Sequence, residues 1–279
     1  MWKLISLALA GTTLLVGGVA YNRYRHAVAE AEAAMSALAD RSSPPRATFG
    51  LEVVDGLPEI AQRYFRHAIR PGTPLATTAR LTMEGTFLLG DRDGFQEYHM
   101  EARQMLSPPS AFVWMPVMRS GLMRISGSDA LVEGQAWTRF WMNGLVPVAD
   151  ARSSPDLVRS ALSRAAMEAT WVPASLLPSN GVRWEQTGPD TARLHFPTGI
   201  EPVDLTLDAD GRVKQIVTMR WSDANPEKVF RLQPFGGTVE GEAEFGGYTI
   251  PTELMVGNHF GTDAYLPFFQ ARVSTADYL

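Results

Sequence analysis

The 279-residue sequence predicts a mainly β protein of the α+β class: a strongly curved antiparallel sheet, or half-barrel, with helices packed on its concave face and an N-terminal transmembrane helix before it. Three observations support this prediction. Residues 4–22 carry no charged side chain. From Thr77 the apolar residues recur at every second position, as they do in half-buried strands. Roughly ten to thirteen strands can be counted, which is more than a flat sheet usually holds before it curls or splits.

Residues 1–25 are predicted to form a membrane anchor. At about 1.5 Å per residue, a helix over residues 4–22 spans roughly the 30 Å hydrocarbon layer of a bilayer. The tyrosines and arginines at positions 21–25 are typical of a membrane interface. A cleaved signal peptide is the alternative, because Gly18-Val19-Ala20 fits a signal-peptidase site. We expect a single-pass protein of the cell inner membrane with a periplasmic or other extracytoplasmic domain, although the flanking charges leave the orientation open.

A helical stalk and linker are predicted for residues 26–56. The Ala-rich segment 25–40 contains no helix breaker and continues the first helix, and the Ser-Pro-rich segment 41–46 ends it. The remaining residues, 57–279, are predicted to form a single β-rich domain.

Two helices are expected in that domain. The first covers residues 58–69, because Pro58 suits the first helical position and apolar residues follow at helical spacing. The second covers residues 155–170, with Ser154 as its N-cap and a stripe of apolar residues along one side. Both helices need an apolar surface to cover, and the concave face of the sheet provides it.

The strands are expected to pair as antiparallel hairpins. Asp-Gly or Gly-Gly turns at residues 91–94, 208–211 and 245–248 separate segments of alternating apolar and polar residues. No fixed-period repeat is visible, which disfavours propellers and solenoids.

Composition and motifs narrow the function. The formal net charge is −5, so a nucleic acid is not expected as a partner. The chain has no cysteine, which excludes disulfides and thiolate metal sites. The five histidines are scattered, and no phosphate loop, nucleophile elbow or zinc helix is present. We therefore expect neither a metal nor a cofactor, and the catalytic residues, if any, are unknown.

Methionines and aromatic residues are concentrated between residues 100 and 142. A wall rich in such side chains can accept acyl chains of varied shape. Residues 112–118 are apolar on both faces of their strand, so each face needs a covering layer. An ordinary sheet core is the alternative interpretation. The predicted ligand-binding residues are Trp114, Met118, Met123, Trp137, Trp141, Glu168 and Trp171.

Glu168 allows two interpretations. It lies at the margin of the apolar stripe of the helix at 155–170, with Arg164 one turn before it. The two residues could form a surface ion pair of little consequence. Alternatively, Glu168 is a carboxylate at the rim of a cavity between helix and sheet, where it faces a polar head group.

Several short motifs resemble those of a bacterial family of membrane-anchored proteins of unknown function. The motifs are Leu57-Pro58, Arg63-Tyr64, His67-Ala68-Ile69, Phe112-Val113-Trp114, Glu168-Ala169-Thr170-Trp171-Val172-Pro173, Leu176-Leu177 and Ile250-Pro251-Thr252-Glu253. The resemblance implies no reaction. The strand pattern is also similar, more loosely, to the LolA-like lipoprotein carriers, and this resemblance implies a curved antiparallel sheet that wraps helices around an apolar cavity.

Three hypotheses for the function follow. The first is a membrane-tethered protein that binds a lipid or another apolar molecule in the cell envelope. The second is a hydrolase or isomerase that uses Glu168 with Glu253 or His259 as acid and base. The third is a scaffold or sensor module without a ligand. The sequence identifies neither the ligand nor the oligomeric state.

Overall fold

The computed structural model describes the backbone of residues 2–91, 94–197 and 199–279, and the side chains of residues 17–90, 94–197 and 199–279. Within these residues, thirteen strands form one antiparallel sheet. The helical elements are α1 (Trp2–Arg41), η1 (Leu51–Val54), α2 (Glu59–Ala68), α3 (Pro155–Met167), η2 (Glu168–Trp171), η3 (Pro173–Leu176) and η4 (Pro178–Asn180), where η marks a 3-10 helix. The strands are β1 (Ala79–Asp91), β2 (Gly94–Ser107), β3 (Ala111–Ser120), β4 (Met123–Val132), β5 (Gln135–Met142), β6 (Val146–Ala151), β7 (Arg183–Gln186), β8 (Thr191–His195), β9 (Val203–Leu207), β10 (Val213–Ser222), β11 (Arg231–Phe245), β12 (Tyr248–Asn258) and β13 (Leu266–Tyr278).

The strands form two meanders that meet in the middle of the sheet. Strands β1 to β6 run in sequence order to one edge, and β7 to β13 run from the other edge back to β1, which pairs with β13. Short turns join the hairpins β9–β10 and β11–β12, as the sequence predicts. The segment between β6 and β7, which contains α3 and η2 to η4, therefore leads from one edge of the sheet to the other.

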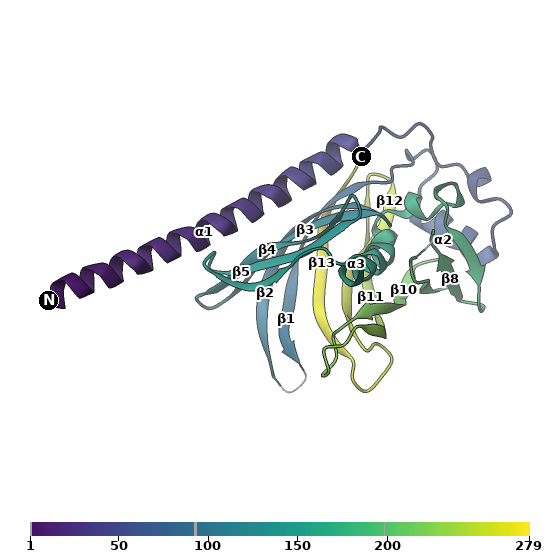
Figure 1. Cartoon of the computed structure of the whole chain (residues 1–279). Helices are drawn as coiled ribbons and strands as arrows, with labels where there is room; N and C mark the ends of the chain where they lie inside the picture. Colours follow the sequence, from purple (N-terminus) through teal and green to yellow (C-terminus); the bar gives the residue numbers. More distant parts are fainter. Residues whose placement is uncertain (1, 92–93, 198) are drawn as a thin grey trace.

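Helix α3 reveals how strongly the sheet is curved. It packs against β3, β4 and β5 near one edge and against β10 near the other edge. A single helix reaches strands so far apart only if the sheet bends around it, and Figure 1 shows α3 inside that bend. The predicted strongly curved antiparallel sheet with a helix on its concave face is confirmed. The curvature is expected physically, because a twisted sheet of this many strands does not stay flat.

Two glycines on the concave face sit where the backbones of neighbouring strands come very close. A Cβ atom on Gly127 of β4 would lie 1.9 Å from the carbonyl oxygen of Arg139, and one on Gly237 of β11 would lie 1.9 Å from that of Met255. No other residue type fits such an approach without a shift of the backbone, and glycine at such positions marks sharp bends in a sheet. Both glycines thus help the sheet to curve.

Helix α1 covers the outer face of the same sheet. It packs against β2, β3 and β4, and Figure 1 shows it along the outside of the bend. Its apolar residues form a second small core with the outward side chains of these strands and of β5. The buried members of this core are Ala31, Met35, Leu38, Met105, Ala111, Val113, Met115, Ala130 and Trp137.

The predicted membrane anchor at residues 4–22 lies, for most of its length, outside the residues whose side chains are described. Within the described residues, no helix combines the length and the apolar character needed to cross a membrane. Residues 26–41 continue α1 and rest on the sheet. The division of the chain into residues 1–25, 26–56 and 57–279 stays a prediction.

Helix α3 begins at Pro155, as the sequence predicts, whereas α2 begins at Glu59, one residue after the predicted start, with Pro58 as its N-cap. The hydroxyl of Ser154 caps α3 by accepting a hydrogen bond from the N–H of Leu157 at 3.2 Å. Helix α2 follows Pro58 and packs near β7, β8 and β12. There the rings of Tyr64 and Phe65 lie 5.2 and 5.3 Å from that of Trp184. Helix α2 thus covers one end of the sheet and leaves the central part of the concave face to α3.

Candidate ligand-binding cavity

A cavity of about 220 Å³ lies between α3 with η2 and the concave face of the sheet. For comparison, an apolar protein cavity of about 150 Å³ holds one benzene molecule. Strands from both halves of the sheet contribute to the wall, including β3, β5, β11 and β13. Its aromatic side chains are Phe87, Trp114, Phe140, Trp171, Phe235, Phe268 and Phe269. The cavity is therefore large enough for a small apolar molecule or for part of an acyl chain.

Trp114 organises the aromatic wall. Its ring centroid lies 6.1 Å from that of Phe87, 6.2 Å from that of Phe140 and 6.2 Å from that of Phe269. These separations are within the range at which aromatic pairs stabilise one another through edge and offset contacts. On the opposite side, the Trp171 indole donates a hydrogen bond to the carbonyl of Pro251 at 3.0 Å, which fixes that ring. The apolar wall is thus built from side chains that hold each other in place.

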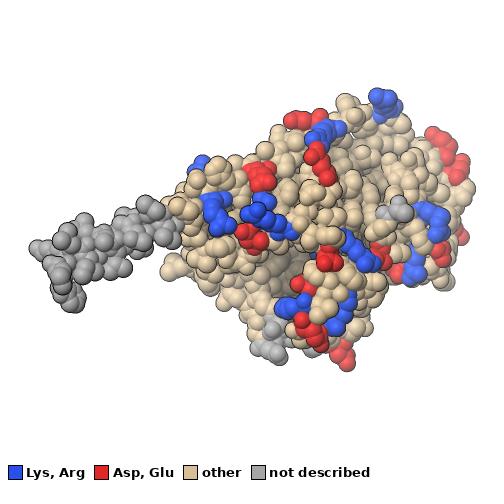
Figure 2. All heavy atoms as spheres, in the orientation of Figure 1, with Lys and Arg blue, Asp and Glu red and all other residues tan. Residues whose placement is uncertain are grey.

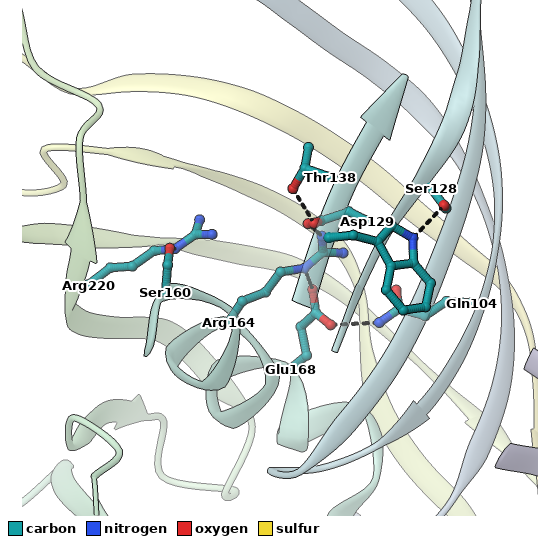
Figure 3. Close-up of polar contacts among 9 residues, drawn as sticks. Gln104, Ser128, Asp129, Thr138, Ser160, Arg164, Glu168 and Arg220 are labelled. Atoms are coloured by element: carbon teal, nitrogen blue, oxygen red, sulfur yellow. Dashed lines mark hydrogen bonds and ion pairs between the residues drawn. The ribbon is translucent and has the colours of Figure 1, made fainter. Parts of the chain in front are cut away.

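One side of the cavity is charged. Arg164 forms ion pairs with Asp129 and Glu168, and the distance from its Nε to Oε1 of Glu168 is 2.7 Å. The second oxygen of Glu168 accepts a hydrogen bond from Gln104 at 2.6 Å, and the second oxygen of Asp129 accepts one from Thr138 at 2.7 Å. Figure 3 shows these side chains converging from α3, η2, β2, β4 and β5. We call these five residues the Arg164 cluster.

The Arg164 cluster is largely shielded from solvent. The side chains of Arg164, Asp129 and Glu168 are only 14%, 18% and 15% exposed. Burial disfavours the charge of Arg164, but the carboxylates of Glu168 and Asp129 outweigh it and raise the pKa of the guanidinium. The guanidinium also lies 4.5 Å from the ring centroid of Phe112 and 5.0 Å from that of Trp114. The charged side and the aromatic wall are therefore one packed unit.

The surface charges of the molecule are arranged differently. Figure 2 shows acidic and basic side chains interspersed over one face of the molecule. Many form exposed ion pairs, such as Arg193 with Asp204 at 2.7 Å, where both side chains are nearly half exposed. Exposed pairs of this kind contribute at most about 1 kcal/mol to stability. The Arg164 cluster differs from such pairs because none of its three charged side chains is more than 18% exposed.

Arg220 of β10 also borders the cavity. Its Nε donates a hydrogen bond to the hydroxyl of Ser160 at 3.1 Å, and its guanidinium lies 4.8 Å from the ring centroid of Phe235. Burial lowers the pKa of Arg220 to about 10, and the nearby charge of Arg164 acts in the same direction while Asp129 opposes it. At neutral pH the side chain remains a cation.

Three of the predicted ligand-binding residues border the cavity: Trp114, Glu168 and Trp171. Met118 shares the inward face of β3 with Trp114, but four residues further on, about 13 Å along the strand, it is buried in the core. Met123 lies at the start of β4, where its sulfur is 3.8 Å from the hydroxyl of Tyr98. Neither methionine contributes to the cavity wall, contrary to the prediction.

Trp137 and Trp141 lie on the opposite face of the sheet, which corrects the prediction that they line the cavity. Trp137 belongs to the core beneath α1, and the ring of Trp141 lies 5.8 Å from that of Tyr24 on α1. Their neighbours Thr138 and Phe140 face the cavity instead. The reason is the alternation of side chains along β5, which divides the Met-rich and aromatic stretch between two faces.

The acid–base partners considered for Glu168 lie elsewhere. Glu253 pairs with Arg272 at 2.8 Å, on the face of β12 opposite the cavity-lining Leu254. His259 follows β12, and its Nε2 lies 3.1 Å from the carbonyl oxygen of Ala224. Neither residue borders the cavity, so the described residues do not assemble the acid–base pair that the enzyme hypothesis needs.

The sequence analysis did not single out Gln104, Asp129 and Arg220. Each of them occupies an inward position of a strand, in line with a buried apolar residue two or four positions away: Leu106, Leu131 and Ile216. A polar residue at an apolar position of a strand is therefore the signal that could have identified them.

A search of solved structures finds similar folds. A LolA superfamily protein from Nitrosomonas europaea is 12% identical, with 78% of this chain and 93% of that chain covered and a TM-score of 0.41. A DUF1329 family protein from Desulfovibrio piger is 9% identical, with 79% and 90% covered and a TM-score of 0.43. A search of the curated proteins finds no match. The model of one family matches residues 47–271, and the chain therefore belongs to the Family of unknown function (DUF6544), in agreement with the predicted membership of a family without an assigned reaction.

Proposed function

We propose that this protein binds a lipid or another apolar small molecule in the cavity between α3 and the curved sheet. The observation that carries the proposal is the cavity itself: its wall is mostly aromatic and aliphatic, and the protein's own side chains leave it unfilled. Pockets for small molecules are typically concave and apolar, with a few converging polar groups. The Arg164 cluster and Arg220 supply such groups here.

The energetic reason is apolar burial. Transfer of a methylene group from water into such a site contributes about 0.8 kcal/mol. Six buried methylenes would therefore contribute about 5 kcal/mol before the entropy cost of binding is subtracted. The tethering of the protein to the inner membrane, with the cavity on its extracytoplasmic side, is part of this proposal. It is supported by the uncharged segment at residues 4–22.

The proposal is tested by searching for a bound ligand. The purified full-length protein is analysed by native mass spectrometry and by lipid extraction, and its tryptophan fluorescence is titrated with decanoate and decan-1-ol. We expect a copurified apolar molecule or saturable binding of at least one probe. A protein that carries nothing and gives flat titrations with both probes would instead favour the scaffold or sensor hypothesis.

Substitution of two pairs of tryptophans can show which face of the sheet binds the ligand. Trp114 and Trp171 border the cavity, whereas Trp137 and Trp141 lie on the outer face under α1. We expect Trp114→Phe and Trp171→Phe to reduce the fluorescence change on binding. The matched controls Trp137→Phe and Trp141→Phe should leave that change in place. The reverse pattern would move the binding site to the outer face.

A further inference from the structure

The cavity contains two arginines, and their partners differ. Arg164 is paired with two carboxylates: its Nε and Nη1 bind Glu168 and Asp129. The remaining oxygens of these two carboxylates are occupied as well, by Gln104 and by Thr138. All four carboxylate oxygens of the Arg164 cluster thus accept hydrogen bonds within the cluster, and none of them binds Arg220.

Arg220 has a spare binding capacity. Its Nε is bonded to Ser160, and among the described residues Nη1 and Nη2 form no hydrogen bond or ion pair. Asp129, Glu168 and Asp223 act on it only from a longer range, because none of them forms an ion pair with it. Figure 3 shows Arg220 reaching from β10 toward the same side of the cavity as Arg164 and Asp129, with no dashed line between them.

A charged guanidinium in a mostly apolar cavity is costly unless an anion compensates for it. The two Nη groups of an arginine present parallel N–H donors whose geometry matches the two oxygens of a carboxylate or a phosphate. The ring of Phe235 next to the guanidinium restricts its movement and so holds the donors in position. The ring of Phe268 lies 6.2 Å from that of Phe235 and continues the apolar wall.

We propose that Arg220 is the receptor for the anionic group of the ligand, and that the ligand class is an apolar chain with one carboxylate or phosphate group. The anionic group binds the two Nη atoms, and the chain lies against the aromatic wall. This inference rests on the proposed function and narrows it from apolar molecules in general to anionic amphiphiles.

The test compares four probes that share one chain and differ in the head group: decanoate, decyl phosphate, decan-1-ol and decan-1-amine. Binding to the full-length protein is measured at neutral pH by isothermal titration calorimetry, below the concentration at which each probe aggregates. We expect an anionic probe to bind about 10-fold to 100-fold more tightly than the alcohol, as one charge-assisted contact provides, and the amine to bind most weakly. The two anionic probes distinguish a carboxylate from a phosphate ligand.

Variants of β10 assign the effect to one side chain. Arg220→Gln should lower the affinity for the preferred anion to that for the alcohol and leave the affinity for the alcohol unchanged. Arg220→Lys, which keeps the charge but not the forked geometry, should retain part of the preference. Lys214→Gln removes an exposed positive charge from the same strand and should change neither affinity.

The outcomes separate this inference from the proposed function. Equal binding of anion and alcohol to the wild-type protein would overturn the role of Arg220 while a binding protein remains. A preference for the anion that persists in Arg220→Gln would also overturn it. Failure of all four probes to bind would count against the proposed function itself. The comparison within the wild-type protein is decisive even if Arg220→Gln does not fold.

Discussion

Strands β3 to β5 bury side chains on both faces, but the two faces are covered in different ways. On the outer face, α1 lies directly on the strands, and Met35, Val113 and Trp137 belong to a small apolar core; beside it an open and more polar groove of about 530 Å³ runs between α1 and the sheet. On the inner face, α3 bridges from these strands to β10 and leaves a cavity beside Trp114 and Phe140. A helix that lies along one group of strands can pack its apolar side chains directly against them. A helix that spans a bend touches both sides of the bend and leaves space between them.

The polar contacts that attach α1 and α3 to the sheet also differ. Helix α1 is held at its margin by exposed ion pairs, such as Glu32 with Arg103 at 2.5 Å. Helix α3 and η2 are held by the buried Arg164 cluster, which joins them to β2, β4 and β5 next to the cavity. The inner face therefore combines an incomplete apolar core with a shielded cluster of charged side chains. Such a combination is typical of a binding site rather than of a structural core.

Removal of Arg164 should have the largest effect. Arg164→Met leaves the carboxylates of Asp129 and Glu168 buried without a cation, which should lower the free energy of unfolding by about 3 to 5 kcal/mol. Urea denaturation measures this change. Neutralisation of both carboxylates in the triple variant Arg164→Met, Asp129→Asn, Glu168→Gln should restore part of the loss. Arg193→Gln, in an exposed pair, should cost less than about 1 kcal/mol. Equal effects of Arg164→Met and Arg193→Gln would show that the cluster does not hold the inner face.

Truncation of Trp137 tests the apolar core beneath α1. Trp137→Ala should cost about 3 kcal/mol or more, because the buried indole leaves a space that its neighbours cannot fill. Phe268→Ala should cost less, because this side chain is only partly buried and already borders the cavity. For ligand binding the order should be reversed: Phe268→Ala should weaken the affinity for the probes, and Trp137→Ala should leave it unchanged. Thermal unfolding and titration with the probes measure both properties.

A Val→Phe substitution can be made on each face of the sheet, and its cost in stability should differ between the two faces. Val113 is fully buried under α1, so Val113→Phe should overpack the outer core and cost about 1 to 3 kcal/mol. Val256 borders the cavity, so Val256→Phe should place the larger ring in free space and cost less than about 1 kcal/mol. It should also abolish binding of the probes by occupying their space. A strongly destabilised Val256→Phe would indicate that the cavity cannot accept added volume.

The smallest effect is expected at the surface of α1. Glu32→Gln removes an ion pair whose side chains are about half exposed, and it should change the free energy of unfolding by less than about 1 kcal/mol. The change should shrink further at high salt, because exposed charges are screened. A larger loss would mean that the ion pairs of α1, and not its apolar contacts, attach it to the sheet.

Much of the fold could be predicted because it depends on local patterns. The alternation of apolar residues from Thr77 onward identifies the strands, the Asp-Gly and Gly-Gly turns identify the hairpins, and Ser154 identifies the start of α3. The number of strands alone indicates that the sheet is curved. The candidate site was predicted only in part, because a concentration of Met and aromatic residues does not reveal which face of a strand each residue occupies.

The sequence by itself determined an antiparallel β protein that is too large to stay flat, with Glu168 and Trp171 at the end of the covering helix. Those properties follow from the period of the side chains and from local turn and cap residues, which act over a few positions. Only the tertiary structure decided that α3 crosses the concave face, that Trp114 faces the cavity while Trp137 and Trp141 pack under α1, and that Arg220 borders the same cavity as the Arg164 cluster. These relations join residues far apart in the chain, and they arise only when the sheet bends and brings β10 opposite β5.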